Sequence, residues 1–199
     1  IDLRGASSTL TELYVWGANA TNDQDYVTSY IPATSGSTVT RNQDVCNNGG
    51  SLATINSTEG VLYAEIAALA NDGTARMINI SDGTLDNRVE ISLSNQDNFI
   101  RVVSIVNGIY NAAKLDISAN VTDFNKIAFS YKENDFKAYL NGTNVFTDTS
   151  AIIFAANTLD TIDFSLPSTN SFDFFGKTKA LAVWKEALSD EELTCLTTI

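Results

Sequence analysis

The sequence predicts an all-β sandwich of antiparallel strands. Turn-forming Asn, Asp, Gly, Ser and Thr residues interrupt the chain roughly every 8–12 residues, and apolar or alternating runs lie between them, which is the pattern of a sandwich or barrel. Asn-Gly pairs in "VNGI" (106–109) and "LNGT" (140–143) are strong hairpin signals. With 199 residues, 44% of them hydrophobic, the chain is long enough to bury one core of this kind.

Several runs between these turns have the length and composition of strands. In "DFKAYLNG", Phe136, Ala138 and Leu140 occupy alternate positions, so they face one side of a sheet, while Lys137 and Tyr139 face the other. A further strand is expected near the start, in "TELYVWGANA" (11–20). The other predicted strands cover residues 76–80, 88–93, 99–106, 126–131, 136–140, 159–164 and 181–184.

The segment "STEGVLYAEIAALAND" (57–72) is ambiguous. Its Ala, Leu and Glu content favours a helix. It also fits a strand that is covered on both faces, entered at Gly60 and left at the turn residues 71–73. Because β-like patterns flank it on both sides, we predict a strand.

The stretch "LAVWKEALSDEELTCL" (181–196) raises the question of an acid/base cluster, because four acidic residues lie close together in it. We interpret it as a closing strand followed by a short helix. Ser189 is a suitable N-cap, and Glu192 three residues later completes a capping box. Leu188 and Leu193 stand at the hydrophobic-staple positions, and acids in the first turn suit the helix dipole. These acids therefore have local structural roles.

Charge and composition exclude several classes of function. The net charge is -12, so the surface repels phosphate backbones and anionic lipids, and nucleic acid is not an expected partner. No apolar run reaches the roughly 18 residues of a membrane span, so no membrane insertion is expected. The sequence contains no His, which excludes Ser-His-Asp and Cys-His catalysis and the usual zinc sites.

We expect two regions along the chain. We expect residues 1–36 to form an N-terminal extension or connector, or to include the last strand of an upstream β-sandwich, because Pro32 and Gly36 discourage regular structure after the strand at 11–20. Residues 37–199 form the main domain. Since the chain begins with Ile1 rather than Met, we expect it to be a processed or excised fragment.

The order of motifs resembles a known family. "EGVLYAEIAAL", "ISDGTLDNRVEI", "FNKIAFSYKENDFKAYLNGTNV" and "GKTKALAVWKEALSDEELTCL" follow one another as in a concanavalin A-like (laminin-G-like) lectin/glucanase domain. This resemblance implies a jelly-roll β-sandwich of two antiparallel sheets with a short C-terminal helix. The front piece, "LYVWGANA…YVTSYIPATSGSTVTR", looks like a connector of phage tail and appendage proteins, which implies a virion-surface or extracellular location and other virion or fibre subunits as partners.

The same resemblance raises the possibility of a glycoside hydrolase. The glucanase branch carries its acids in a Glu-x-Asp-x-x-Glu pattern on one strand, but here Glu65 is followed by Ile-Ala-Ala. In "DNRVEI", Asp86, Arg88 and Glu90 share one face, and Arg88 between two acids is expected to form an ion pair on a solvated sheet face. We therefore predict that the domain is not an enzyme.

Carbohydrate binding is the function that we favour. Sugar sites combine aromatic faces with amide, carboxylate and guanidinium groups, although turn chemistry and core packing also explain such residues. Calcium is a related possibility through Asp82 and Asp86 of "SDGTLDN", which a bare turn explains equally well. The candidate sugar-binding residues are Asp86, Asn87, Arg88, Tyr110, Asn170 and Phe172.

The sequence thus predicts a non-catalytic, lectin-like module of a phage virion or secreted cell-surface protein, with a glycan or cell-surface polysaccharide as partner. The alternative is a purely structural virion or fibre domain without a ligand, and a glycoside hydrolase is less favoured. Cys46 and Cys195 could form a disulfide if the ends of the domain meet, or remain two buried free thiols.

Overall fold

The computed structural model describes residues 49–169 and 171–199. The expected extension at 1–36, Cys46 and Asn170 lie outside these residues. The described chain forms ten strands and one helix: β1 (Glu59–Ala68), β2 (Arg76–Ser81), β3 (Arg88–Leu93), β4 (Phe99–Val106), β5 (Ile109–Ser118), β6 (Asn125–Lys132), β7 (Phe136–Leu140), β8 (Thr143–Asp148), β9 (Thr161–Asp163), β10 (Gly176–Trp184) and α1 (Asp190–Thr197).

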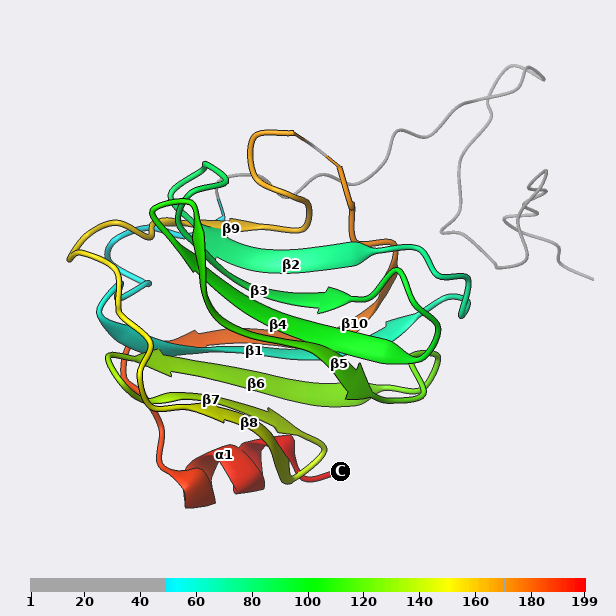
Figure 1. Ribbon diagram of the computed structural model, residues 1–199. Helices are drawn as coiled ribbons and strands as arrows, with labels where there is room; N and C mark the ends of the chain where they lie inside the picture. Colours follow the sequence, from blue (N-terminus) through cyan, green and yellow to red (C-terminus); the bar gives the residue numbers. More distant parts are fainter. Residues whose placement is uncertain (1–48, 170) are drawn as a thin grey trace, which may run out of the picture. The chain divides into compact units, whose positions relative to one another are not determined.

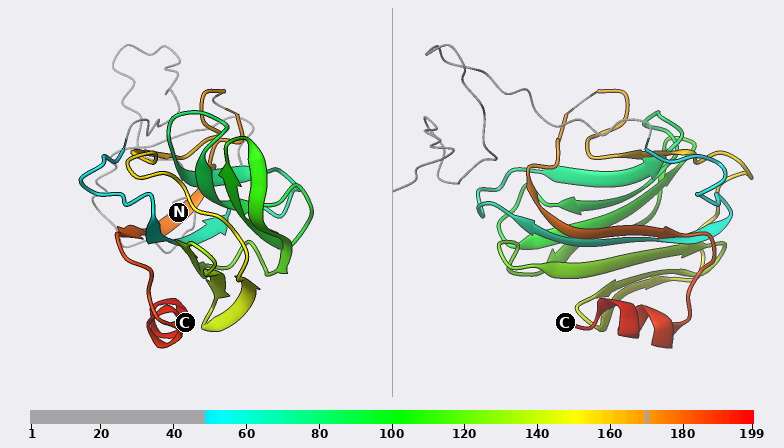
Figure 2. Two further views of the ribbon diagram at one scale, coloured as in Figure 1. Left: turned by 60° about the vertical axis from the view of Figure 1, so that its left-hand side comes forward. Right: turned by 180° about the vertical axis from the view of Figure 1, so that it is seen from behind.

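The strands form two five-stranded antiparallel sheets. Sheet A has the order β5-β4-β3-β2-β9, and sheet B has the order β10-β1-β6-β7-β8. The two sheets lie face to face, and α1 lies on the far side of sheet B (Figures 1 and 2). The prediction of a jelly-roll sandwich with a short C-terminal helix is therefore confirmed.

The main core lies between the sheets and follows the two-residue period of the strands. Sheet B contributes Leu62, Phe129 and Tyr131, and sheet A contributes Ile78 and Ile91, all of them almost completely buried. Burying a side chain of this size contributes roughly 1.5–3 kcal/mol to stability. The core therefore decides which face of each strand points inward.

Strand β1 confirms the strand prediction for the ambiguous segment. Leu62 and Ile66 face the main core, whereas Val61 and Tyr63 belong to a second apolar cluster on the outer side of sheet B, with Leu193 of α1. Both faces of β1 are thus covered by protein. This coverage explains a run without polar alternation, whose composition resembles that of a helix.

Both Asn-Gly hairpins are present. The φ angles are positive at Asn107 and Gly108 (52° and 78°) and at Asn141 and Gly142 (50° and 83°), as a two-residue type I′ turn requires. These turns lead into β5 and β8, for which the pattern predicted no strand range. Both strands lie at sheet edges and are half exposed, so their sequences are too polar to stand out. Strand β9 is shorter than predicted, and β10 is longer.

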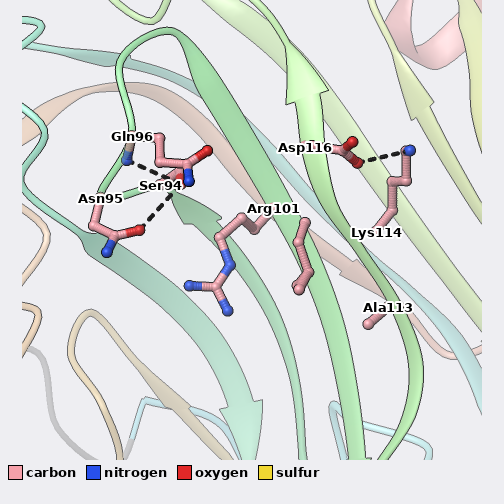
Figure 3. A pocket seen from close by; sticks show the side chains of 8 residues that line it. Ser94, Asn95, Gln96, Arg101, Ala113, Lys114 and Asp116 are labelled. Atoms are coloured by element: carbon pink, nitrogen blue, oxygen red, sulfur yellow. Dashed lines mark hydrogen bonds and ion pairs between the residues drawn. The ribbon is translucent and has the colours of Figure 1, made fainter.

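Strand β5 contains two irregularities against β4. Between the pairs Ser104–Ala112 and Ile105–Tyr110, β5 has one extra residue. Between the pairs Ile100–Ile117 and Val102–Lys114, two β5 residues oppose the single β4 residue Arg101. Such bulges re-aim side chains and commonly lie beside functional sites. Figure 3 shows Arg101 between the 94–96 loop and the β5 residues Lys114 and Asp116.

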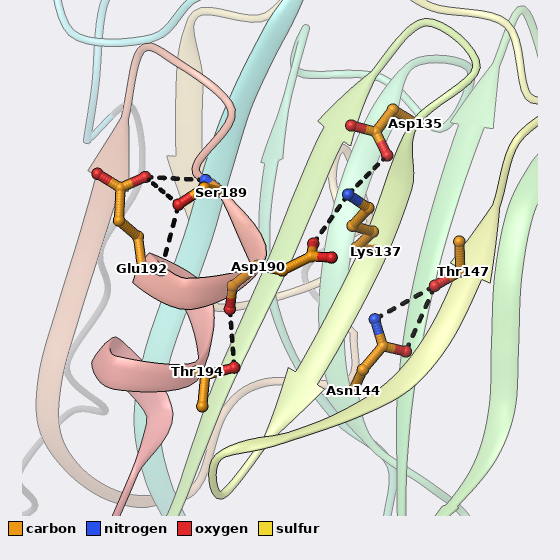
Figure 4. Close-up of polar contacts among 8 residues, drawn as sticks. All are labelled: Asp135, Lys137, Asn144, Thr147, Ser189, Asp190, Glu192 and Thr194. Atoms are coloured by element: carbon orange, nitrogen blue, oxygen red, sulfur yellow. Dashed lines mark hydrogen bonds and ion pairs between the residues drawn. The ribbon is translucent and has the colours of Figure 1, made fainter.

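Helix α1 begins with the predicted capping box. The Ser189 hydroxyl accepts a hydrogen bond from the Glu192 backbone N–H (3.3 Å), and the Ser189 N–H donates to the Glu192 carboxylate (2.8 Å; Figure 4). The Ser189 backbone N–H and the Ser189 hydroxyl both donate to the Glu192 carboxylate, and these two hydrogen bonds lower the pKa of Glu192. Leu188 and Leu193 both join the second apolar cluster, and Lys137 of β7 forms an ion pair with Asp190 (2.9 Å). Asp190 and Glu192 therefore serve the fold.

Replacing Ser189 by Ala should lower the free energy of unfolding by about 1 kcal/mol, because a hydroxyl that caps the helix is lost. Urea unfolding followed by circular dichroism measures this change. Thr194→Ala is the matched control, since its hydroxyl donates to the Asp190 carbonyl inside the same helix (2.7 Å), and Ala is the better helix former. An equal loss in both variants would contradict the capping role.

Candidate functional site

The outer face of sheet A carries a group of charged side chains. Because Val89 and Ile91 of β3 point into the core, the residues that alternate with them, Arg88, Glu90 and Ser92, point outward. The strand registers place these outward residues in rows across β2, β3 and β4. The rows are Ser81–Arg88–Ile105, Asn79–Glu90–Val103 and Met77–Ser92–Arg101.

A pocket of about 150 Å³ lies over these rows, and we call it the sheet A pocket. Its walls come from the strands of sheet A and from the segment that follows β9. It is lined by Ala75, Arg76, Met77, Arg88, Glu90, Ser92, Arg101, Tyr110, Leu166 and Phe172.

Arg88 and Glu90 form an ion pair in the floor of the pocket. The Arg88 Nε lies 2.9 Å from the Glu90 Oε2, and the two residues are only 8% and 1% exposed. The Ser92 hydroxyl donates to the Glu90 Oε1 (3.3 Å), and the Arg88 Nη1 donates to the Leu85 carbonyl. The expected pair is present, but the expectation of a solvated face was wrong, because the pocket walls bury both groups.

Arg101 differs from Arg88 because its guanidinium has no partner in the described part of the chain. Among the described residues, no hydrogen bond or ion pair engages its guanidinium, and its Nε is buried. Arg76 is intermediate, since it forms an ion pair with Asp72 (2.8 Å) and donates to the Thr74 carbonyl (3.1 Å), while its buried Nε has no partner among the residues that the structure describes. A buried N–H donor without a partner is unfavourable, so the two Nε groups favour an acceptor such as an anion arriving from solvent.

The pocket is positive in a protein that is strongly acidic overall. Three of the five Arg residues in the sequence line it, and Glu90 is the single acidic residue among its described lining residues. Such a local positive region attracts and orients an anionic ligand while the rest of the surface repels it.

Two exposed aromatic side chains border the pocket. Tyr110 is 60% exposed and Phe172 is 49% exposed. The extra β5 residue next to Tyr110 is Asn111, and it brings Tyr110 opposite Ile105 on the outer face. Phe172 has a φ of 57°, and its carbonyl accepts a hydrogen bond from the Met77 N–H (2.9 Å). This backbone conformation costs about 1–3 kcal/mol and is often found at ligand sites.

The structure brings three of the predicted sugar-binding residues together, namely Arg88, Tyr110 and Phe172. Asp86 and Asn87 lie instead in the β2–β3 turn, where the Asp86 carbonyl accepts from the Gly108 N–H and Asn87 bonds the Asn107 N–H. Asn170 lies outside the described residues. The sugar-binding role of all six stays a prediction.

Sequence reasoning did not assign Arg76, Ser92 or Arg101 to the site and considered Glu90 only as a catalytic acid. A usable signal was present, because a charged residue inside an otherwise apolar strand is unusual. "RVEISL" and "FIRVVSIV" both carry it.

Asp82, one of the two predicted calcium ligands, has other partners. Asp82 accepts hydrogen bonds from the backbone and hydroxyl of Thr84 (2.9 and 2.6 Å) and from the Asn87 amide (2.8 Å). Within residues 49–169 and 171–199, no three His, Cys, Asp or Glu side chains are grouped as metal ligands. The calcium site at Asp82 and Asp86 stays a prediction. So does the disulfide, since Cys195 is exposed on α1 and Cys46 is not described.

The fold is similar to that of several solved structures. No family model and no curated protein matches the sequence. The CBM40 domain of the Ruminococcus gnavus IT-sialidase, bound to α2,3-sialyllactose, superposes with a TM-score of 0.58 at 17% identity, over 70% of this chain and 83% of that chain. A heptameric SAP-like pentraxin from Limulus polyphemus gives 0.56 at 11% identity, over 74% and 72%.

A leech intramolecular trans-sialidase also matches, with a TM-score of 0.57 at 22% identity, over 72% of this chain but only 24% of the enzyme. At these identities the similarity concerns the fold alone. No helix in the described part of the chain has the length and apolar character needed to cross a membrane.

Arg88 and Arg101 should respond oppositely to the same substitution. Arg88→Met leaves Glu90 buried without its partner, so the free energy of unfolding should fall by about 3–5 kcal/mol. Arg101→Met removes a guanidinium that has no partner in the described structure, so stability should change by less than about 1 kcal/mol or rise. Urea unfolding of both variants tests this, and equal losses would mean that Arg101 has an internal partner.

The Asp72–Arg76 pair should make stability depend on acid pH. The hydrogen bond from Arg76 lowers the pKa of Asp72 from 3.8 to about 2. Because the pKa of Asp72 is lower in the folded than in the unfolded state, the ionised carboxylate stabilises the fold at pH values above the unfolded-state pKa. This contribution disappears as the pH falls through about 2. The stability difference between wild type and Asp72→Asn should therefore shrink between pH 5 and about pH 2 in urea unfolding.

Asp97→Asn is the control for this experiment, since it removes an exposed carboxylate with no ion pair in the described structure. If both variants show the same pH dependence, the change does not come from the Asp72–Arg76 pair.

Proposed function

We propose that this domain is a non-catalytic carbohydrate-binding module whose sheet A pocket recognises a sugar bearing a carboxylate, such as sialic acid. The observation that carries the proposal is the guanidinium of Arg101, which lines the pocket without a partner in the described structure and lies in the next cross-strand row to the buried Arg88–Glu90 pair.

The pocket offers each kind of contact that such a sugar needs. A guanidinium binds a carboxylate through two parallel hydrogen bonds, and no described residue occupies the donors of Arg101. The Arg88–Glu90 pair presents donors and acceptors for hydroxyl or amide groups. The faces of Tyr110 and Phe172 are exposed for packing against the ring.

The fold similarity supports this proposal only in combination with the pocket chemistry. The similar Ruminococcus gnavus domain is bound to sialyllactose, in its α2,3 form in one structure and its α2,6 form in another. The described chain is of the size of that binding domain and spans about a quarter of the leech enzyme. Other proteins of this fold have different names and activities, so the Arg residues of this chain decide the proposal.

A binding role also suits the acid chemistry of the pocket. Glycoside hydrolysis commonly needs two carboxyl groups on either side of the bond, whereas Glu90 is the single acid among the described lining residues. Both Glu90 oxygens already accept hydrogen bonds, from Arg88 and Ser92, and no hydrogen bond joins Glu90 to Tyr110 in the described structure. Glu90 and Tyr110 are therefore not arranged as a general base and the nucleophile that it activates.

The wider setting that we propose is a phage virion or a secreted cell-surface protein, with the module at the virion surface or outside the cell. Its support is the sequence resemblance of the front piece, which lies outside the described residues. Mass spectrometry of purified virions and of culture supernatant tests this setting separately from ligand binding.

The wild-type domain should bind 3′-sialyllactose but not lactose in isothermal titration calorimetry, and binding should weaken as salt is added. Arg101→Met should reduce affinity for 3′-sialyllactose roughly 10- to 100-fold, as expected for a lost charge-assisted hydrogen bond, while the fold remains stable.

Lys177→Met is the matched control, because it removes an exposed cation from β10 in sheet B. Equal binding of lactose, or no binding of sialylated and uronic-acid oligosaccharides, would reject the proposal. The second result would favour the purely structural alternative.

A further inference from the structure

A second, larger cleft lies next to the sheet A pocket. It has a volume of about 640 Å³ and runs between the β3–β4 loop and β5 (Figure 3). Arg101 lines both cavities. We call this second cavity the β5 cleft, and Asn95, Gln96, Lys114, Leu115 and Asp116 form most of its wall.

The bulge in β5 shapes this cleft. Leu115 and Asp116 together oppose the single residue Arg101, so one residue of β5 has no ladder partner there. Leu115 remains 47% exposed although it is apolar and lies in a strand. An ordinary register would place one side chain opposite Arg101, whereas here two consecutive β5 residues border the cavity.

The lining of the β5 cleft differs from that of the sheet A pocket in its charge. Lys114 and Asp116 neutralise each other in an exposed ion pair (2.7 Å), and Asn95 and Gln96 contribute neutral amides. No hydrogen bond engages the Gln96 side-chain amide within the described residues. Donors and acceptors that alternate around an apolar Leu match a neutral sugar, whose hydroxyls and C–H faces need both.

We propose that the β5 cleft is a second sugar subsite, which takes a neutral sugar attached to the acidic sugar in the sheet A pocket. This inference rests on the proposed function. Leu166 and Phe172 belong to the segment that flanks the β2 edge of the sheet A pocket, and Arg101 lies on its β5 side. When the carboxylate of a ligand binds Arg101, the next sugar of that ligand therefore lies over β5. The domain then binds at least two linked sugars.

The test compares N-acetylneuraminic acid with 3′-sialyllactose, by NMR titration for both ligands. The trisaccharide should bind the wild type about three- to tenfold more tightly than the free acid, as one or two extra hydrogen bonds would produce. The double variant Lys114→Ser/Asp116→Ser and the single variant Gln96→Ala should abolish most of this difference. Their affinity for free N-acetylneuraminic acid should stay within about twofold of wild type.

The double variant leaves the net charge unchanged, so long-range attraction of the ligand is preserved. Its matched control is Lys132→Ser/Glu59→Ser, which removes an exposed ion pair of sheet B (3.0 Å) and should leave both affinities unchanged. Circular dichroism and urea unfolding confirm that each variant is folded.

The outcomes separate the two proposals. Equal wild-type affinity for the two ligands, or cleft variants that preserve the advantage of the trisaccharide or weaken both ligands equally, would overturn the second subsite and leave the proposed function standing. If the wild type binds neither ligand, the second subsite is overturned, and if it also binds no uronic-acid oligosaccharide, the proposed function itself is overturned.

Discussion

The packing of sheet A against sheet B is the constraint on which the rest of the structure depends. Val89 and Ile91 are completely buried between the sheets, so Arg88 and Glu90 have only the outer face available. A register slip of one residue would place the charged pair in the core and the apolar side chains in the pocket. The burial of the apolar side chains therefore fixes the strand register, and with it the side chains that face the pocket.

The three arginines of the pocket illustrate how one residue type serves two purposes. Arg88 is engaged by Glu90 and by a backbone carbonyl, so it belongs to the folded structure and orients its neighbour. Arg101 has no such partner in the described residues, and its charge is available to a ligand. Sites that bind tightly commonly combine both kinds, because fixed groups hold the geometry while a free group supplies the new interaction.

The two sides of the molecule have separate roles. On sheet B, α1 covers an apolar cluster that includes Tyr63 and Leu193, and its acids cap and anchor the helix. On sheet A, the outer face is left open for the pocket and the β5 cleft. Strand β5 can carry two bulges because it is an edge strand, whose irregularities disturb one neighbour instead of two.

The sequence by itself determined the sandwich, both Asn-Gly hairpins and the capping box, because these depend on local patterns: a two-residue period, residues that tolerate positive φ, and a hydroxyl three residues before an acid. It also pointed to Arg88, Tyr110 and Phe172 as residues of interest, since each stands beside a turn or in a polar stretch.

Only the tertiary structure decided that these three residues line one pocket with Arg76, Glu90 and Arg101. Five of these residues come from four strands, and Phe172 lies some 60 residues or more after them in the chain. Their proximity depends on the order of the strands in the sheet and on two bulges, which no local sequence pattern specifies. The burial of the Arg88–Glu90 pair was missed for the same reason, because the walls that exclude water come from distant parts of the chain.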